Sequence, residues 1–172
     1  MVAIQLGVGV DEAFGRLRIF AAATDQRLTD VACSVVERRM QLSSPTTVDA
    51  AGNVVMWDLG GGAGVSRQAR GHMSALAASW GLDDDHRDSA LYVLNELVDN
   101  AVEHGGGLLG VAVGREGHGV KASVLDGSID PPTVHPHDPL AARGHGLQVV
   151  EALALRWGYL VHEFGKTVWA RT

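Results

Sequence analysis

The sequence predicts an α+β protein built as a two-layer sandwich, with helices on one face of a mixed, mainly antiparallel sheet. Two observations predict this class. Apolar residues recur at helical spacing through much of residues 11–104, and they alternate at strand spacing through much of residues 108–171. Helices that are segregated onto one face of a mainly antiparallel sheet form an α+β two-layer arrangement. A small N-terminal helical segment is expected in addition to the sandwich.

The composition fits one ordinary core with a small appendage. The chain has 172 residues, of which 46% are hydrophobic and 20% are charged. We find neither a stretch apolar enough for a membrane span nor a signal-peptide pattern, so we expect a cytoplasmic protein without membrane contact. Cys33 is the only cysteine, which excludes an internal disulfide. The net charge of −6 disfavours a large non-specific nucleic-acid surface.

Two helices are predicted near the N-terminus, at 11–23 and at about 30–42. Thr29 is placed to cap the second helix. Two helices of this length rarely hold together alone, so they need a third element or a partner surface. The residues that share the apolar face of the first helix are Ala13, Leu17, Phe20 and Ala21.

Residues 43–53 have the composition of a linker and mark the best domain boundary. They separate a helical segment at 1–42, which has zero net charge, from a domain at 54–172. A strand is expected at 54–58. The glycine run at 60–64 lacks the ending of a phosphate-binding loop and is interpreted as a connection.

Two longer helices follow, at about 66–80 and 85–104. Gly81 is placed to end the first helix, and three glycines at 105–107 end the second. The four tryptophans of the chain lie on predicted apolar faces and are expected in the core.

The remainder predicts a sheet interrupted by one helix. A hairpin is expected to turn at 116–119, followed by a long loop at 127–142 that is rich in Pro, Asp and His. A helix at about 146–156 precedes two closing strands, at 157–164 and 167–171.

The polar face of the 85–104 helix offers the ligands that Mg²⁺ requires. Counting 100° per residue places Glu96, Asp99, Asn100, Glu103 and His104 on one side. A carboxylate and an amide at positions i and i+4 can hold a hydrated Mg²⁺. The alternative is the ordinary polar half of an amphipathic helix, although Asn is a poor helix former and is not an obvious choice for such a face.

The run at 143–147 opens another helix with a glycine-framed N-terminus. Free backbone N–H groups at such an end can contact phosphate oxygens. Together, this run and the polar helix face predict a site for a magnesium nucleotide.

The order of these parts resembles the GHKL ATPase fold, and most closely the small actinobacterial anti-sigma-factor serine kinases. The resemblance covers about residues 54–172. It is carried by the residues at 95–104, 124–128, 143–150, 156–159 and 165–169.

The resemblance implies ATP or ADP with Mg²⁺ as ligands. Asn100 would place its amide oxygen on Mg²⁺, and Glu96 would act as general base or orient the attacking group. Asp126 would accept a hydrogen bond from the adenine amino group. The chain reads Asp-Gly-Ser-Ile-Asp at 126–130, where the wider family has Asp-x-Gly-x-Gly.

The resemblance also assigns the phosphate end of the site. The backbone of Gly144 and Gly146 would approach the phosphates, and the Arg143 guanidinium would contact the terminal phosphate. His104 either contacts phosphate or stabilises the C-terminus of its helix through the helix dipole.

The function implied by the resemblance is that of an ATP-binding regulatory protein. Its partners would be a sigma factor, an anti-sigma antagonist or both, and a homodimer is one possible assembly. Transfer of phosphate to a Ser or Thr of the antagonist, which would make the protein a serine/threonine kinase, stays open.

Residues 2–42 separately resemble the later part of an ANTAR RNA-binding domain, through the residues at 5–13, 17–18, 27–32 and 36–39. The alternative function is therefore that of an RNA-binding antitermination regulator with a nucleotide-sensing or degenerate ATPase domain. A helical pair that simply packs on the ATPase-like domain explains residues 1–42 equally well.

Overall fold

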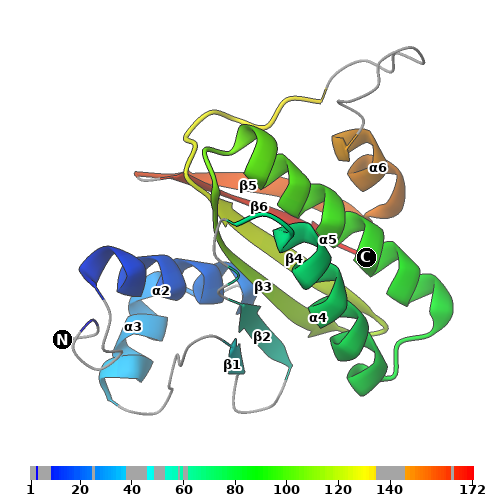
Figure 1. Ribbon diagram of the computed structural model, residues 1–172. Helices are drawn as coiled ribbons and strands as arrows, with labels where there is room; N and C mark the ends of the chain where they lie inside the picture. Colours follow the sequence, from blue (N-terminus) through cyan, green and yellow to red (C-terminus); the bar gives the residue numbers. More distant parts are fainter. Residues whose placement is uncertain are drawn as a thin grey trace.

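The protein is a single sheet of six strands with helices against both faces (Figure 1). The computed structural model describes residues 3, 9–24, 26–37, 46–48, 53–57, 59, 62–134, 146–163 and 165–172. The strands lie in the order β1-β2-β3-β4-β6-β5. They are β1 (Thr46–Val48), β2 (Val54–Trp57), β3 (Leu108–Glu116), β4 (Gly119–Asp126), β5 (Arg156–His162) and β6 (Gly165–Arg171).

The α+β class is confirmed, but the sheet is not mixed. All five strand pairings among the described residues are antiparallel. The β3–β4 hairpin turns at the predicted place, through Gly117 with a φ of 61°. At the other end of β4, Asp126 lies opposite Leu108 of β3 and opposite Lys166 of β6. This register brings a carboxylate and an ammonium group together at one end of the sheet.

Three helices cover one face of the sheet: α4 (Val65–Trp80), α5 (Asp84–His104) and α6 (Gly146–Leu153). The backbone N–H of His86 donates to Asp83 Oδ1 at 2.9 Å, which caps α5 and holds the pKa of Asp83 below its ordinary value. Within the described ranges, no helix combines the length and apolar character needed to cross a membrane.

One stripe of α5 faces the core. Leu94, Leu97, Val98 and Ala101 are buried against the sheet and α4. Val102 is 43% exposed because it lies at the edge of this apolar stripe. The stripe therefore fixes which side of α5 faces away from the core.

Two N-terminal helices, α2 (Val10–Thr24) and α3 (Leu28–Val36), pack on the opposite face of the sheet (Figure 1). A Cβ on Gly110 of β3 would overlap the side chain of Ile19, so α2 rests directly on the strand. Helices α4, α5 and α6 thus cover one face of the sheet, as predicted, and the N-terminal helical segment adds a layer on the other face. The second core contains Leu17, Ile19, Phe20, Ala21, Val31 and Val35 from the helices and Val54, Met56, Ala112 and Leu125 from the strands.

The boundaries of α3 differ from the prediction. Arg27, not Thr29, is the N-cap residue, and the Arg27 Nε to Asp30 Oδ2 contact of 3.0 Å lies across the first turn. The helix ends at Val36, and the rest of the predicted helix, residues 38–42, lies outside the described residues.

Part of the predicted linker at 43–53 is strand. Residues 46–48 form β1, which pairs with β2 and makes one edge of the sheet. The packing of α2 and α3 agrees with the view of residues 1–42 as a helical pair on the ATPase-like domain. Their separate folding and their binding of RNA stay predictions.

The tryptophans divide between the two faces. Trp57 and Trp80 are buried in the main core, as expected. Trp169 is only partly buried and lies near two cations, with Lys121 Nζ and Arg171 Cζ at 5.6 and 5.7 Å from its ring centre. The expectation of four core tryptophans is therefore wrong for Trp169, because its position on β6 alternates with the core residues Val168 and Ala170.

Candidate functional site

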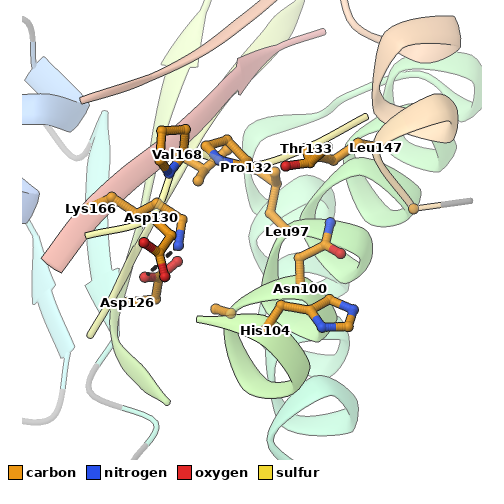
Figure 2. Close-up of a pocket in the computed structure, with 13 residues that line it drawn as sticks. Leu97, Asn100, His104, Asp126, Asp130, Pro132, Thr133, Leu147, Lys166 and Val168 are labelled. Carbon is orange, nitrogen blue, oxygen red and sulfur yellow. Dashed lines mark hydrogen bonds and ion pairs between the residues drawn. The ribbon is translucent and has the colours of Figure 1, made fainter. Parts of the chain in front are cut away.

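A cavity of about 270 Å³ lies between α5, the ends of β4 and β6, and the start of α6. Figure 2 shows its two walls, with Asn100 and His104 from α5 facing Asp126 and Lys166 from the sheet. The lining residues are Leu97, Asn100, Ala101, His104, Asp126, Asp130, Pro131, Pro132, Thr133, Gly146, Leu147, Lys166 and Val168.

The helical wall depends on a close approach between α5 and α6. A Cβ placed on Gly146 would lie 2.7 Å from Glu96 Oε2 and 3.2 Å from Asn100 Nδ2. The start of α6 therefore sits directly on the two side chains that the sequence assigns to Mg²⁺ and to the attacking group. A residue with a side chain at 146 would displace one of them.

Asn100 carries an unsatisfied donor at this wall. Its Nδ2 is buried and has no hydrogen-bond partner in the described part of the chain. Buried polar atoms are rarely left without partners, so this atom indicates a group that the described residues do not supply. The O and N atoms of an amide are assigned from their surroundings, so either can face an incoming ligand.

The donor set at this wall fits Mg²⁺. This ion keeps several waters and is held in proteins by one or two oxygen-bearing side chains together with substrate phosphates. Glu96 and Asn100 offer one carboxylate and one amide oxygen, one helical turn apart. No cluster of three or more His, Cys, Asp or Glu side chains with metal-binding geometry occurs among the described residues.

The sheet wall is built around Asp126, whose side chain is 3% exposed. Its Oδ1 accepts hydrogen bonds from the backbone N–H of Ser128 at 2.9 Å and from Lys166 Nζ at 3.0 Å. Burial raises the pKa of Asp126 above its ordinary value, and these two hydrogen bonds oppose the rise. Asp126 is thus a buried acceptor, held in place by a backbone turn and a cation.

Two glycines fix the position of Asp126. A Cβ on Gly105, just after α5, would lie 2.6 Å from Asp126 Cγ. Gly165 begins β6 with a φ of 150°, and a Cβ there would overlap the carbonyl oxygen of Asp126. The glycines at these two positions let the end of α5 and the start of β6 approach the carboxylate closely.

Asp99, expected on the polar face beside the Mg²⁺ ligands, instead links two helices. Ser66 Oγ donates to Asp99 Oδ1, and Asn95 Nδ2 donates to Asp99 Oδ2 at 2.7 Å. Arg70 Nη1 donates in turn to Asn95 Oδ1 at 2.8 Å. These bonds tie α4 to α5 beside the site, and Asp99 does not line the cavity.

The structure brings most of the predicted site residues together. Asn100, His104, Asp126 and Gly146 line the cavity, and Glu96 adjoins it through Gly146. The His104 side chain is 70% exposed, and its Nε2 lies 3.9 Å from the neighbouring Glu103 Oε2. Arg143 and Gly144 lie outside the described residues.

Sequence reasoning missed Lys166 as a site residue. A signal was present, since residues 166, 168 and 170 of β6 share one face, and Val168 and Ala170 are core residues. A lysine on a buried face requires a partner or a ligand. Its partner could not be found from local sequence because Asp126 lies 40 positions away.

Comparison with known proteins supports the fold. A scan against protein-family models finds no match, and a search of curated proteins finds none. Among solved structures, the chain is similar to the crystal structure of the RsbU and RsbW domains of Rv1364c from Mycobacterium tuberculosis, with 25% identity and a TM-score of 0.53. The match covers 69% of this chain and 31% of that chain. The chain thus has an α+β fold of the GHKL ATPase type.

Proposed function

We propose that the protein binds ATP or ADP with Mg²⁺ and acts as a regulatory protein of the anti-sigma-factor kinase type. The proposal rests on one observation: residues from three different elements line one cavity. Asn100 from α5, Asp126 from β4 and Gly146 from α6 are far apart in the sequence and line the same space. This is the set of elements that the GHKL resemblance assigns to the nucleotide.

Each wall has a separate task in this proposal. Asp126 accepts a hydrogen bond from the adenine amino group, and Asn100 places its amide oxygen on hydrated Mg²⁺. The bound ion neutralises charge on the phosphate oxygens. The N-terminus of α6 at Gly146, together with Gly144 and Arg143, contacts the phosphates.

Catalysis is the second part of the proposal. Glu96 accepts the proton of a Ser or Thr hydroxyl on a protein partner, and the hydroxyl oxygen attacks the γ-phosphorus. The bond between the γ-phosphorus and the β,γ-bridging oxygen breaks, and ADP leaves. The nearness of Glu96 Oε2 to the start of α6 supports this role, because α6 is the element proposed to hold the phosphates. The partners are a sigma factor, an antagonist or both, as the resemblance and the RsbW-containing structure suggest.

Calorimetric titration with ATP and Mg²⁺ tests the binding part. Wild type should bind ATP and ADP, and omission of Mg²⁺ should weaken binding. Asn100→Ala should weaken binding of the magnesium nucleotide about tenfold or more, since it removes a charge-assisted contact. Asn53→Ala, at an exposed asparagine outside the cavity, is the matched control. Absence of binding by wild type at millimolar nucleotide would contradict the proposal.

Transfer from γ-labelled ATP to a Ser-bearing partner tests the catalytic part. Glu96→Ala should lower the transfer rate by about 10²–10⁴-fold, the usual contribution of a general base, while nucleotide affinity stays within a few fold. Transfer by Glu96→Ala at the wild-type rate would show that another group is the base. Absence of transfer by wild type would leave a nucleotide-dependent binding protein.

A further inference from the structure

We propose that Lys166 is a second base-recognition residue, which donates a hydrogen bond to a ring nitrogen of adenine beside the amino group that Asp126 accepts. This inference rests on the proposed nucleotide site and names the feature that selects its base. It comes from the juxtaposition of a buried cation and a buried carboxylate in the wall of the cavity (Figure 2).

The pair is fixed by the sheet. Lys166 and Asp126 lie directly opposite each other on the neighbouring strands β6 and β4. Their side chains are 6% and 3% exposed, and Lys166 Nζ lies 3.0 Å from Asp126 Oδ1. Both residues line the cavity. The ammonium group is therefore held at the end of the pocket where the base is proposed to bind.

Lys166 has hydrogen-bonding capacity that the protein does not use. An ammonium group carries three N–H donors. In the part of the chain that the structure describes, its hydrogen-bond partner is Asp126, which takes one of them. Leaving buried charged donors without acceptors is costly, and the residue faces a cavity. A ligand acceptor beside Asp126 would satisfy a further donor.

Asp126 limits which base can complete the pair. A carboxylate has about four lone-pair positions, and Oδ1 already accepts from Ser128 and Lys166. Oδ2 remains for the ligand. Adenine needs one acceptor for its amino group and one donor for N1 or N7, which Oδ2 and Lys166 supply. Guanine can donate N1–H to Oδ2 and accept from Lys166 at O6, but its adjacent N2–H then faces Oδ1, which already accepts from Ser128 and Lys166. Adenine has no such extra donor at this edge, so the pair favours adenine over guanine.

The test measures the affinity of several nucleotide analogues for the 172-residue protein and its variants. ATP, 1-deaza-ATP, 7-deaza-ATP and GTP are titrated with Mg²⁺ into wild type and Lys166→Met. In each deaza analogue a C–H group replaces the ring nitrogen that would accept from Lys166. The control is Lys121→Met, at a lysine that is equally buried but contacts Trp169 and does not line the cavity.

Wild type and Lys121→Met should bind one of the two deaza analogues about tenfold or more weakly than ATP, the usual effect of losing a hydrogen bond to a charged group. Both should also prefer ATP to GTP. In Lys166→Met the penalty for that analogue should disappear, so that ATP and the analogue bind equally.

Three results would overturn the inference. The first is that wild type binds ATP and both deaza analogues equally, a result that holds even if Lys166→Met fails to fold. The second is that Lys166→Met loses affinity for all four nucleotides by the same factor, because Lys166 would then only hold Asp126 in place. Tighter binding of GTP than ATP reverses the base assignment. If wild type binds no nucleotide at all, both the proposed function and this inference fail.

Discussion

Gly146 shows how much of the site depends on single residues. A Cβ at this position would lie 2.7 Å from Glu96 Oε2 and 3.2 Å from Asn100 Nδ2. Leu97 and Ala101, which follow these two residues along α5, are buried in the core. Added volume at position 146 must therefore be accommodated inside the site.

Gly146→Ala is expected to weaken binding of ATP with Mg²⁺ by about tenfold or more, because the added methyl group displaces Glu96 or Asn100. The free energy of unfolding should change little, because the atom that must move is the end of a flexible side chain. Calorimetry and urea unfolding measure the two effects. Gly71→Ala, where a Cβ meets nothing within 4 Å, is the control and should leave affinity unchanged. Wild-type affinity in Gly146→Ala would show that Glu96 and Asn100 are not needed in their present positions.

Asp126 should make the free energy of unfolding depend on pH. Burial raises its folded-state pKa above the ordinary value of 3.8, so the folded protein keeps this proton to higher pH than the unfolded chain. The folded state then binds more protons in the window just above 3.8. The contribution of Asp126 to the free energy of unfolding must therefore fall as pH rises through that window.

Asp126→Asn should remove this downward contribution, so that wild type loses more stability than the variant as the pH rises above 3.8. Urea unfolding over a pH series that begins near 3.8 measures the difference. Parallel pH curves for wild type and variant would contradict the assigned direction of the pKa.

At the level of elements, α4 contributes mainly by packing and by its bonds to α5. One stripe of α4 (Val65, Ala69, Met73, Ala77 and Trp80) is buried, and Gly71 lies on the exposed side. Glycine in a helix interior costs stability because the unfolded chain gains freedom and no side chain is present. Gly71 therefore lowers the stability of α4 at a position away from the site.

Gly71→Ala is expected to raise the free energy of unfolding by about 0.5–1 kcal/mol. The same urea series measures it, with the slope of the transition unchanged. A loss of stability would mean that the exposed side of α4 is covered in solution by something beyond the described residues.

Across the whole molecule, the sheet is shared by two cores. Removing residues 1–42 would uncover the strand residues that α2 and α3 bury: Val54, Met56, Ala112 and Leu125. We expect the fragment that begins at residue 43 to melt at a lower temperature than the full chain, since apolar burial is lost. Calorimetric scans of both proteins test this. Equal melting temperatures would favour independent folding of the predicted domain at 54–172.

Local pattern was enough to predict most elements but not their packing. The α5 stripe and the β3–β4 hairpin follow from spacing that neighbouring residues reveal. Asn100, Asp126 and Gly146 could be assigned because short motifs and a family resemblance marked them. The Lys166–Asp126 pair and the packing of α2 on Gly110 could not be predicted. Strand register and layer packing join residues that are distant in the sequence. The predicted roles of Arg143 and Gly144 remain predictions.

Residues 125 and 126 of β4 point to opposite faces of the sheet. Leu125 packs with α2 and α3, while its neighbour Asp126 lines the cavity. A molecule that binds these helices better in one placement of β4 than in another would alter nucleotide affinity. Thermodynamic reciprocity then requires the nucleotide to alter the affinity for that molecule by the same factor. One strand thus gives the N-terminal helices a two-way energetic link to the nucleotide.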